Sequence, residues 1–372
     1  MAHRFLFSSG GTGGHMFPAQ AVAKQILIRE PNSHILFIGG DLKGNRCFDR
    51  GSFAFEEIAC SSLSHKKLLS LIKGGGNIAK GFIQSRKVIK NFNPHVVVGF
   101  GSFHTFPTLA AASMTSVPIV LHEGNAIPGK VNKLFSRYSR VTGIHFPEAA
   151  TLLRGKTVEV GMPMRKGYSK AFGYKDEARD YFGLDREKFT ILIFGGSQGA
   201  MTINAKFSIA AIDIAHRMKD FQVVHLTGSA VDCKECRRLY KGLGVGAYVA
   251  EFEERMDLAW LAADLFIGRA GASTIAEQLE FEVPGIYVPY PYAADNHQES
   301  NADFVVSDVK GAVKVMQKDI ADETLCNAVF DIVGNEQEKL KEFVGNIRAF
   351  KEKRTRRDLC SLVCEVAGMD MR

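Results

Sequence analysis

The chain has 372 residues, of which 46% are hydrophobic and 23% are charged, a balance typical of a folded protein and not of a disordered one. This length exceeds what one ordinary core can organise, so two domains of roughly 150–200 residues are expected. The formal net charge of +7 indicates an anionic partner, such as a nucleotide, a nucleic acid or an acidic membrane surface, without choosing among them.

Short apolar segments alternate with helical patterns through both halves, which predicts two parallel sheets with helical crossovers. The strands expected in the first half are 3–7, 35–38, 96–100, 119–121 and 141–144, and a helix is expected from about Pro18 to Arg29. Those expected in the second half are 190–194, 222–226, 248–249, 265–267 and 285–288. A stretch rich in proline and glycine, 161–167, divides the chain into domains 1–160 and 161–372. The terminal helical region, from about residue 336, could pack back on the first domain.

The cysteines and the longest uncharged stretch indicate which classes of protein are excluded. Seven cysteines, an odd number, argue against a disulfide framework and for a reducing compartment, so we expect inert thiols. Cys233 and Cys236 form the single CxxC, and no second pair completes a zinc site. Residues 91–122 carry no charge, but three prolines and two glycines interrupt them. They predict two buried strands and a short helix, not a membrane span, and no signal peptide is expected.

Two of the expected strands run into glycine-rich turns. Residues 5–7 lead into the turn 8–15 (SSGGTGGH), and residues 191–194 lead into the turn 195–200 (GGSQGA). Such units expose backbone N–H groups to an anion at a helix N-terminus. Neither G-x-G-x-x-G nor G-x-x-x-x-G-K-[S/T] occurs, so a standard dinucleotide site and a P-loop are not indicated. His15 ends the first turn, where the helix N-terminus favours a neutral imidazole. It is interpreted as a general base or, alternatively, as an ordinary loop histidine.

A third small-residue turn, 268–274, follows the strand 265–267 and opens another helix with its positive dipole end. Thr274 and Glu277 match a capping box, so a structural and a functional interpretation of Glu277 both stay open. Residues 295–298 (DNHQ) gather hydrogen-bonding side chains that could bind a hydroxyl-rich ligand. No Asp-x-Asp is present to hold a divalent ion against a diphosphate. We therefore expect that no metal or other cofactor is strictly required.

Five motifs occur in the order seen in the MurG family, the peptidoglycan N-acetylglucosaminyltransferases, which the chain resembles over essentially its whole length. These motifs are residues 10–15, 122–126, 195–200, 269–277 and 295–298. The resemblance implies an α/β fold with two Rossmann-like domains facing across a cleft, the glycosyltransferase-B fold. It also implies inverting transfer of N-acetylglucosamine from UDP-N-acetylglucosamine (UDP-GlcNAc) to the C4 hydroxyl of lipid I, undecaprenyl-pyrophosphoryl-MurNAc-pentapeptide. The product would be lipid II.

The resemblance implies that the second domain binds the donor. The residues implied to contact it are Arg165, Ser197, Glu253, Ala272, Ser273, Thr274, Glu277 and Gln298. Within this set, Glu277 would bind the ribose hydroxyls and Gln298 the sugar. The backbone of residues 272–274 would meet the phosphates, Arg165 and Ser197 the nucleotide, and the backbone around Glu253 the uracil edge.

The first domain is implied to bind the acceptor. Thr12, Gly13 and Gly14 would meet the acceptor pyrophosphate, with His15 and Asn125 near the acceptor hydroxyl. The chain departs from the usual family pattern at Gly124, Met162, Glu253 and Ala270. None of these departures removes a residue implied to act in catalysis.

A lipid acceptor implies a peripheral location on the cytoplasmic face of the bacterial inner membrane, with an anionic lipid surface and no nucleic acid as partner. The segment 65–73 places leucines and an isoleucine between lysines, and residues 80–90 continue this mixture. The pattern predicts either an ordinary amphipathic helix packed on the core or a membrane anchor.

Two other functions stay open from the residues. A UDP-sugar epimerase of similar two-domain architecture would convert the donor without lipid I. A nicotinamide-dependent oxidoreductase would use Asp41, which follows the second strand, as a ribose-binding acid.

Overall fold

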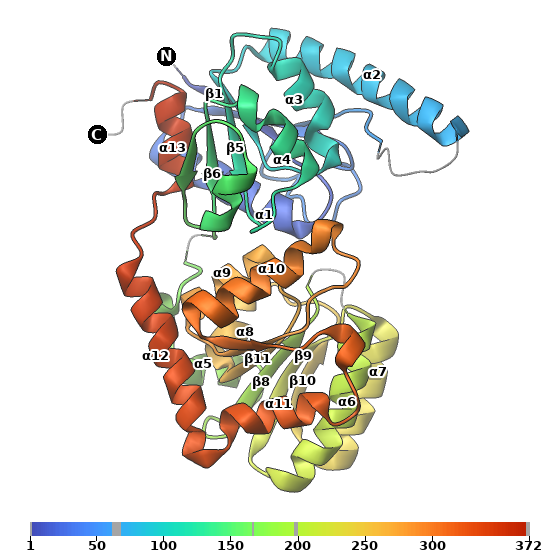
Figure 1. The fold of residues 1–372 in the computed structure, drawn as a ribbon, viewed down its shortest axis with the longest axis vertical. Helices are drawn as coiled ribbons and strands as arrows, with labels where there is room; N and C mark the ends of the chain where they lie inside the picture. Colours follow the sequence, from blue (N-terminus) through green and yellow to red (C-terminus); the bar gives the residue numbers. More distant parts are fainter. Residues whose placement is uncertain (1, 62–67, 166, 197–199, 370–372) are drawn as a thin grey trace. The chain divides into compact units, whose positions relative to one another are not determined.

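The computed structural model describes residues 2–61, 68–165, 167–196 and 200–369 (Figure 1). The chain forms two compact units: Met1–Lys166 together with Arg356–Arg372, and Gly167–Thr355. The chain therefore passes between the units twice, and its last residues belong to the first unit. The first boundary lies at residue 166, a few residues beyond the one expected from the sequence.

The first unit contains a seven-stranded sheet with the order β3-β2-β1-β4-β5-β6-β7, in which every neighbouring pair is parallel. Its strands are β1 (Arg4–Ser8), β2 (His34–Gly39), β3 (Ala54–Glu57), β4 (Val96–Gly99), β5 (Ile119–Glu123), β6 (Val141–Ile144) and β7 (Thr157–Glu159). The five inner strands of this list correspond to expected strands, whereas β3 and β7, at the two edges, were not predicted.

Helices cover both faces of this first sheet. One face packs against α1 (Gly13–Arg29) and α13 (Leu359–Val366), and the other against α2 (Leu68–Phe92), α3 (Phe106–Ala112) and α4 (Lys130–Phe135). Helix α13, red in Figure 1, thus contributes to the core of the first unit. Its N-cap Asp358 accepts hydrogen bonds from two backbone N–H groups and pairs with Arg29 at the end of α1.

The second unit repeats the architecture with six parallel strands in the order β10-β9-β8-β11-β12-β13. Its strands are β8 (Phe189–Phe194), β9 (Phe221–Leu226), β10 (Gly246–Ala250), β11 (Leu265–Gly268), β12 (Gly285–Tyr287) and β13 (Ala312–Lys314). Its helices are α5 (Lys175–Tyr181), α6 (Met201–Arg217), α7 (Ala230–Leu243), α8 (Met256–Ala262), α9 (Ala272–Phe281), α10 (His297–Phe304), α11 (Thr324–Val333) and α12 (Glu338–Lys353). Helices α6, α7, α11 and α12 pack on one face, while α8 and α9 contact the other.

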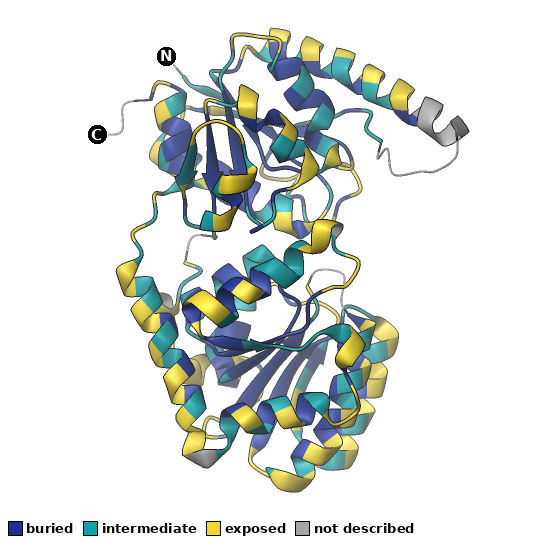
Figure 2. Ribbon diagram, in the orientation of Figure 1, coloured by how far each residue is buried: buried dark blue, intermediate teal, exposed yellow. Residues whose placement is uncertain are grey.

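The inner strands of both sheets are largely buried on both faces, and Figure 2 shows them mostly in dark blue. In β4, for example, Val96, Val97 and Val98 are all fully buried. Helices on both faces of a parallel sheet require this, which is why such strands form continuous apolar runs in the sequence. The predicted fold class, two Rossmann-like α/β domains, is therefore confirmed.

Each sheet reverses its strand order once, between β1 and β4 in the first unit and between β8 and β11 in the second. Ligands of open parallel sheets bind outside the carboxyl ends of the strands at such a point. The turn 8–15 follows β1, the turn 195–200 follows β8, and the turn 268–274 follows β11. All three turns singled out in the sequence therefore lie at the positions where this architecture binds ligands.

The C-terminal end of α9 forms ion pairs with residues near both places where the chain passes between the units. Its C-cap Glu282, in the left-handed conformation, pairs with Lys170, just after the first crossing, at 2.8 Å. The same carboxylate pairs with Arg348 at 2.8 Å and Lys351 at 3.3 Å, which precede the second crossing. Burial alone would raise the pKa of Glu282, but the hydrogen bonds from Lys170 and Arg348 outweigh it and lower the pKa to about 2.

Candidate functional site

The first glycine turn leads directly into α1. The helix begins at Gly13 and not near Pro18 as predicted, so Gly13, Gly14 and His15 form its first turn. Thr12 is the N-cap, with no capping bond from its side chain among the described residues, and the first helical turn contains no acidic residue. The helix N-terminus thus keeps backbone donors and the positive dipole end for an anion.

Close packing explains why this turn is made of glycines. A Cβ on Gly13 would lie 2.7 Å from the ring of Phe17, and a Cβ on Gly10 would lie 2.6 Å from the carbonyl oxygen of Gly40. Gly11 has a φ of +85°, which larger residues rarely adopt. The amide of Asn45 donates to the Gly11 carbonyl at 2.5 Å and fixes the turn from the segment after β2.

His15 has a defined tautomer. Its Nδ1 lies 2.7 Å from the carbonyl oxygen of Phe100, in the segment after β4. A carbonyl oxygen can only accept, so Nδ1 carries the proton and the lone pair of the neutral ring is on Nε2. The side chain is half-buried and oriented by a neighbouring strand end. This arrangement suits a group that accepts a proton at Nε2.

His122, at the carboxyl end of β5, differs from His15 in burial. Burial and, to a smaller extent, the charge of a protonated His15 together lower the pKa of His122 to about 3. Its ring packs against Phe100 with centroids 5.4 Å apart. His122 therefore stays neutral near pH 7 and contributes to packing.

Asn125 is positioned by the buried carboxylate of Glu123. Oε1 of Glu123 accepts from the backbone N–H and the side-chain amide of Asn125, at 2.9 and 3.2 Å. Oε2 accepts from the Gly129 N–H at 3.0 Å and the Asn132 amide at 2.9 Å. Sequence reasoning missed the role of Glu123. Its one signal was a carboxylate at the end of an otherwise apolar strand.

In the second unit, α9 begins at Ala272 with Gly271 as its N-cap. Thr274 is therefore the third helical residue, and the capping-box interpretation of Glu277 is wrong, because the helix starts ahead of Thr274. The hydroxyl of Ser273 is buried without a hydrogen-bond partner among the described residues. Residues 272–274 thus combine the backbone donors of a helix N-terminus with an unsatisfied hydroxyl, as a phosphate site would.

Glu277 is held by the neighbouring helix α8. Its Oε2 accepts a hydrogen bond of 2.9 Å from the indole N–H of Trp260, which is fully buried. Sequence reasoning did not identify Trp260, although it is the single tryptophan of the chain. The carboxylate of Glu277 is therefore fixed in direction and is not a helix cap.

Arg269 links the turn after β11 to the segment after β12. Its buried guanidinium donates to the carbonyl oxygens of Val288 and Pro289 at 3.0 and 3.1 Å. In that segment, the N–H of Tyr290 donates to Oε1 of Gln298 at 3.0 Å. The position of Gln298, at the start of α10, thus depends on the same segment. Arg269 is a third residue whose role the sequence reasoning missed.

The remaining predicted donor residues have other surroundings. The carboxylate of Glu253 accepts from the Tyr248 hydroxyl at 2.7 Å and from the Arg255 N–H at 2.8 Å, so its side chain serves its own loop. Arg165 lies in the first unit, with its guanidinium 4.9 Å from the ring centre of Phe17. Ser197 lies outside the described residues.

Three further predictions concern metals, membrane spans and cysteines. Within the described ranges, no group of three or more His, Cys, Asp or Glu side chains could hold a metal ion. In the same part of the chain, no helix combines the length and apolarity needed to cross a bilayer. None of the seven cysteines, all of which are described, forms a disulfide.

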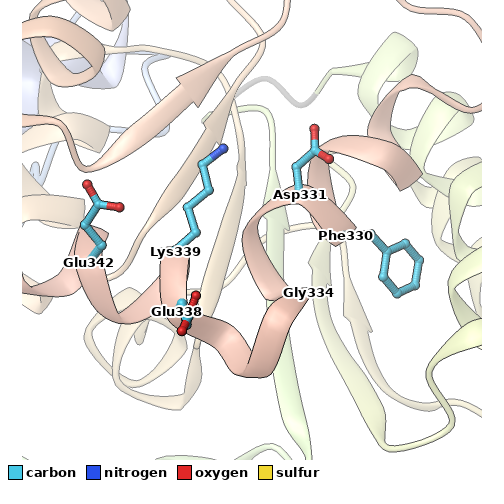
Figure 3. A pocket seen from close by; sticks show the side chains of 6 residues that line it. All are labelled: Phe330, Asp331, Gly334, Glu338, Lys339 and Glu342. Carbon is cyan, nitrogen blue, oxygen red and sulfur yellow. The ribbon is translucent and has the colours of Figure 1, made fainter.

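An open groove of about 420 Å³ lies between the end of α11 and the start of α12. Figure 3 shows Lys339 standing between the carboxylates of Asp331 and Glu342 at this groove. None of the residues predicted to bind donor or acceptor lines it. The groove is thus separate from the three turns.

The comparisons with known proteins give the same family for both halves of the chain. Residues 5–144 match the glycosyltransferase family 28 N-terminal domain, and residues 190–355 match the family 28 C-terminal domain. The chain is 44% identical to a UDP-N-acetylglucosamine–N-acetylmuramyl-(pentapeptide) pyrophosphoryl-undecaprenol N-acetylglucosamine transferase of Protochlamydia amoebophila, over 99% of this chain and 97% of that one. It is 33% identical to the Chlamydia pneumoniae protein of the same name, over 96% of each chain.

A solved structure shares the fold. The crystal structure of Acinetobacter baumannii MurG matches with a TM-score of 0.75 at 24% identity, covering 98% of this chain and 100% of that one. These matches give no support to the epimerase alternative. The resemblance noted in the five motifs is thus confirmed: the chain belongs to glycosyltransferase family 28 and, within it, to the MurG family of N-acetylglucosaminyltransferases.

Proposed function

We propose that the chain transfers N-acetylglucosamine from UDP-GlcNAc to the C4 hydroxyl of lipid I and so forms lipid II. The observation that carries this proposal is the 44% identity, over 99% of the chain, to a transferase named for that donor and that acceptor. Glycine turns at both topological switch points agree with a reaction between two anionic, phosphate-bearing substrates.

The start of α9 is proposed as the site of the donor diphosphate. The unsatisfied hydroxyl of Ser273 and the uncapped N-terminus support this assignment. When the sugar departs, negative charge grows on the UDP leaving group, and fixed donors aimed at that charge lower the barrier. Glu277, oriented by Trp260, would accept from the ribose hydroxyls, and Gln298 would bind the sugar.

His15 is proposed as the general base. The C4 hydroxyl oxygen of the muramoyl sugar attacks the anomeric carbon, the bond from that carbon to UDP breaks, and the proton of the C4 hydroxyl moves to Nε2 of His15. One displacement inverts the anomeric configuration and gives a β-1,4 link. The hydrogen bond from Nδ1 to Phe100 supports the required tautomer. A positioned base contributes about 10²–10⁴ in rate.

No divalent ion is proposed to be strictly required. Helix N-termini and backbone N–H groups would neutralise the diphosphate charge that a metal neutralises elsewhere. The two uncapped helix starts, at Gly13 and at Ala272, support this proposal.

A peripheral location on the cytoplasmic face of the inner membrane is proposed through α2. Ile83 is 68% exposed there, and Lys80, Arg86, Lys87 and Lys90 are also exposed. The helix contains no acidic residue. Residues 62–67, at the start of the predicted anchor, lie outside the described residues. An apolar side chain among basic ones is the composition that binds anionic lipid surfaces.

One reaction tests the proposed function. The protein is incubated in detergent with UDP-GlcNAc and lipid I, and mass spectrometry follows the lipid. Lipid I should gain one N-acetylglucosamine with release of one UDP, and UDP-GlcNAc alone should persist. Unchanged lipid I, or conversion of the donor without acceptor, would refute the proposal.

A further inference from the structure

The segment after β4 has a strained backbone beside the first glycine turn. Because β4 pairs with β1, both turns leave the same edge of the sheet. Gly101 has a φ of +80°, and Ser102, which is not a glycine, has a φ of +72°. The Thr105 hydroxyl closes this turn by donating to the Ser102 carbonyl at 2.9 Å. Strain of this kind in a non-glycine residue is typical of ligand-binding segments.

This turn places His104 against the glycines of the first turn. A Cβ on Gly10 would lie 2.6 Å from the Cβ of His104, and a Cβ on Gly40 would lie 2.7 Å from its Nδ1. A Cβ on Gly11 would lie 3.2 Å from Cδ2 and 3.5 Å from Nε2 of the same ring. The glycines thus make room for this imidazole, whose Cδ2–Nε2 edge faces the turn at Gly11.

The two ring nitrogens of His104 are in different environments. Nδ1 is buried and has no hydrogen-bond partner among the described residues. A buried N–H without an acceptor is rarer in proteins than an unused acceptor, so the proton belongs on Nε2. Burial lowers the pKa of His104, the carboxylate of Asp41 opposes this shift, and His15 adds to it. Near pH 7 the ring is a neutral donor at the glycine turn.

We propose that His104 is a further acceptor-binding residue, whose Nε2–H donates to a pyrophosphate oxygen of the lipid-linked acceptor at the turn formed by Gly10–Gly14. This inference rests on the proposed function, which assigns the acceptor pyrophosphate to that turn. His104 would supply a side-chain donor beside the backbone donors of Gly13 and Gly14. The proton transfer remains with His15, whose Nδ1 is committed to Phe100.

Three substitutions separate binding from structure. His104→Phe keeps a ring against Gly10 and Gly11 but removes both nitrogens. The KM for lipid I should rise about tenfold to a hundredfold, the usual cost of losing a hydrogen bond to a charged group. The Kd for UDP-GlcNAc and the kcat at saturating lipid I should change less than about threefold, since the donor site and His15 are intact. His104→Gln, whose amide nitrogen reaches the position of Nε2, should recover most of the affinity. His104→Asn, whose amide reaches the position of Nδ1, should not.

The control is His34→Phe, an exposed histidine at the amino end of β2, which should leave every constant unchanged. A KM for lipid I within twofold of wild type in His104→Phe would overturn the inference. Equal losses in the Gln, Asn and Phe variants, together with a lower Tm, would also overturn it, because they would indicate a packing role. Both results leave lipid II formation by the wild type intact. A wild type that makes no lipid II would instead overturn the proposed function, and this inference with it.

Discussion

Replacing Glu277 by glutamine separates two roles of one carboxylate. In the structure, Oε2 of Glu277 accepts a hydrogen bond of 2.9 Å from the indole N–H of the fully buried Trp260. Glutamine offers a carbonyl oxygen to the same donor but carries no charge. Glu277→Gln therefore removes the ionic part of the proposed ribose contact and keeps the internal hydrogen bond.

The size of each effect follows from these contacts. A hydrogen bond to a charged group exceeds one between neutral groups by about 1.4 kcal/mol, so the KM for UDP-GlcNAc should rise about tenfold in Glu277→Gln. Glu277→Ala also leaves the Trp260 N–H buried and unpaired, which costs about 1–3 kcal/mol. At about 2–4 °C per kcal/mol for a domain of this size, its Tm should fall by about 2–12 °C.

Steady-state kinetics and thermal melting of the two variants test this reasoning. Both should show the raised KM for UDP-GlcNAc, whereas Glu277→Ala alone should show the lower Tm. Glu254→Gln, which changes an exposed carboxylate nearby in the sequence, serves as the matched control and should resemble wild type. An unaltered KM in Glu277→Gln would refute the ribose contact. An equal fall of Tm in both variants would refute the assigned role of Trp260.

Four further outcomes are expected. His15→Ala should lower kcat about 10²–10⁴-fold with an unchanged Kd for UDP-GlcNAc by calorimetry, and a normal kcat would exclude it as the base. Exhaustive EDTA treatment should leave transfer in detergent intact, whereas activity restored only by Mg²⁺ or Mn²⁺ would reveal a required ion. Arg86→Glu with Lys87→Glu should reduce co-sedimentation with anionic vesicles while sparing transfer to a short-chain, water-soluble acceptor, and unchanged vesicle binding would exclude α2 as the contact. Glu282→Gln should lower the free energy of unfolding, measured by urea denaturation, by about 1–2 kcal/mol at pH 7. This value is reduced to allow for solvent screening of the ion pairs. The folded pKa of Glu282, about 2, lies below its ordinary value of 4.5. The loss of stability should therefore be complete above about pH 4.5 and diminish as the pH falls toward 2. A loss that does not depend on pH would contradict the pairing.

The inner strands could be predicted because their burial is visible in their own sequence. Buried on both faces, they form short apolar runs, and the range 141–144 agrees with β6 at both ends. The edge strands β3, β7 and β13 were missed because they are short and partly exposed. In β3, exposed Ala54 and Glu56 alternate with half-buried Phe55 and Glu57. Such segments become strands by pairing with a neighbour, and one segment's composition does not reveal that neighbour.

The helix starts were less predictable for a related reason. The sequence predicts that the first helix starts at about Pro18. The structure instead starts α1 at Gly13 and includes Pro18 in its interior. Glycines are poor helix formers in isolation, yet Gly13 and Gly14 both lie in the first turn of α1. Local propensity therefore does not locate the start of α1, at the turn where the proposed chemistry is located.

The same distinction separates the predicted site residues from the missed ones. His15 and Ser273 stand out locally because each follows a strand and a glycine turn. The residues that orient the predicted side chains do not, because they come from distant segments: Phe100 orients His15 from 85 positions away. Gly10 illustrates the limit, since its sequence context explains a tight turn but not the imidazole of His104 packed against it. A glycine in such a turn therefore reports both a backbone conformation and a space, and only the structure identifies the side chain that fills the space.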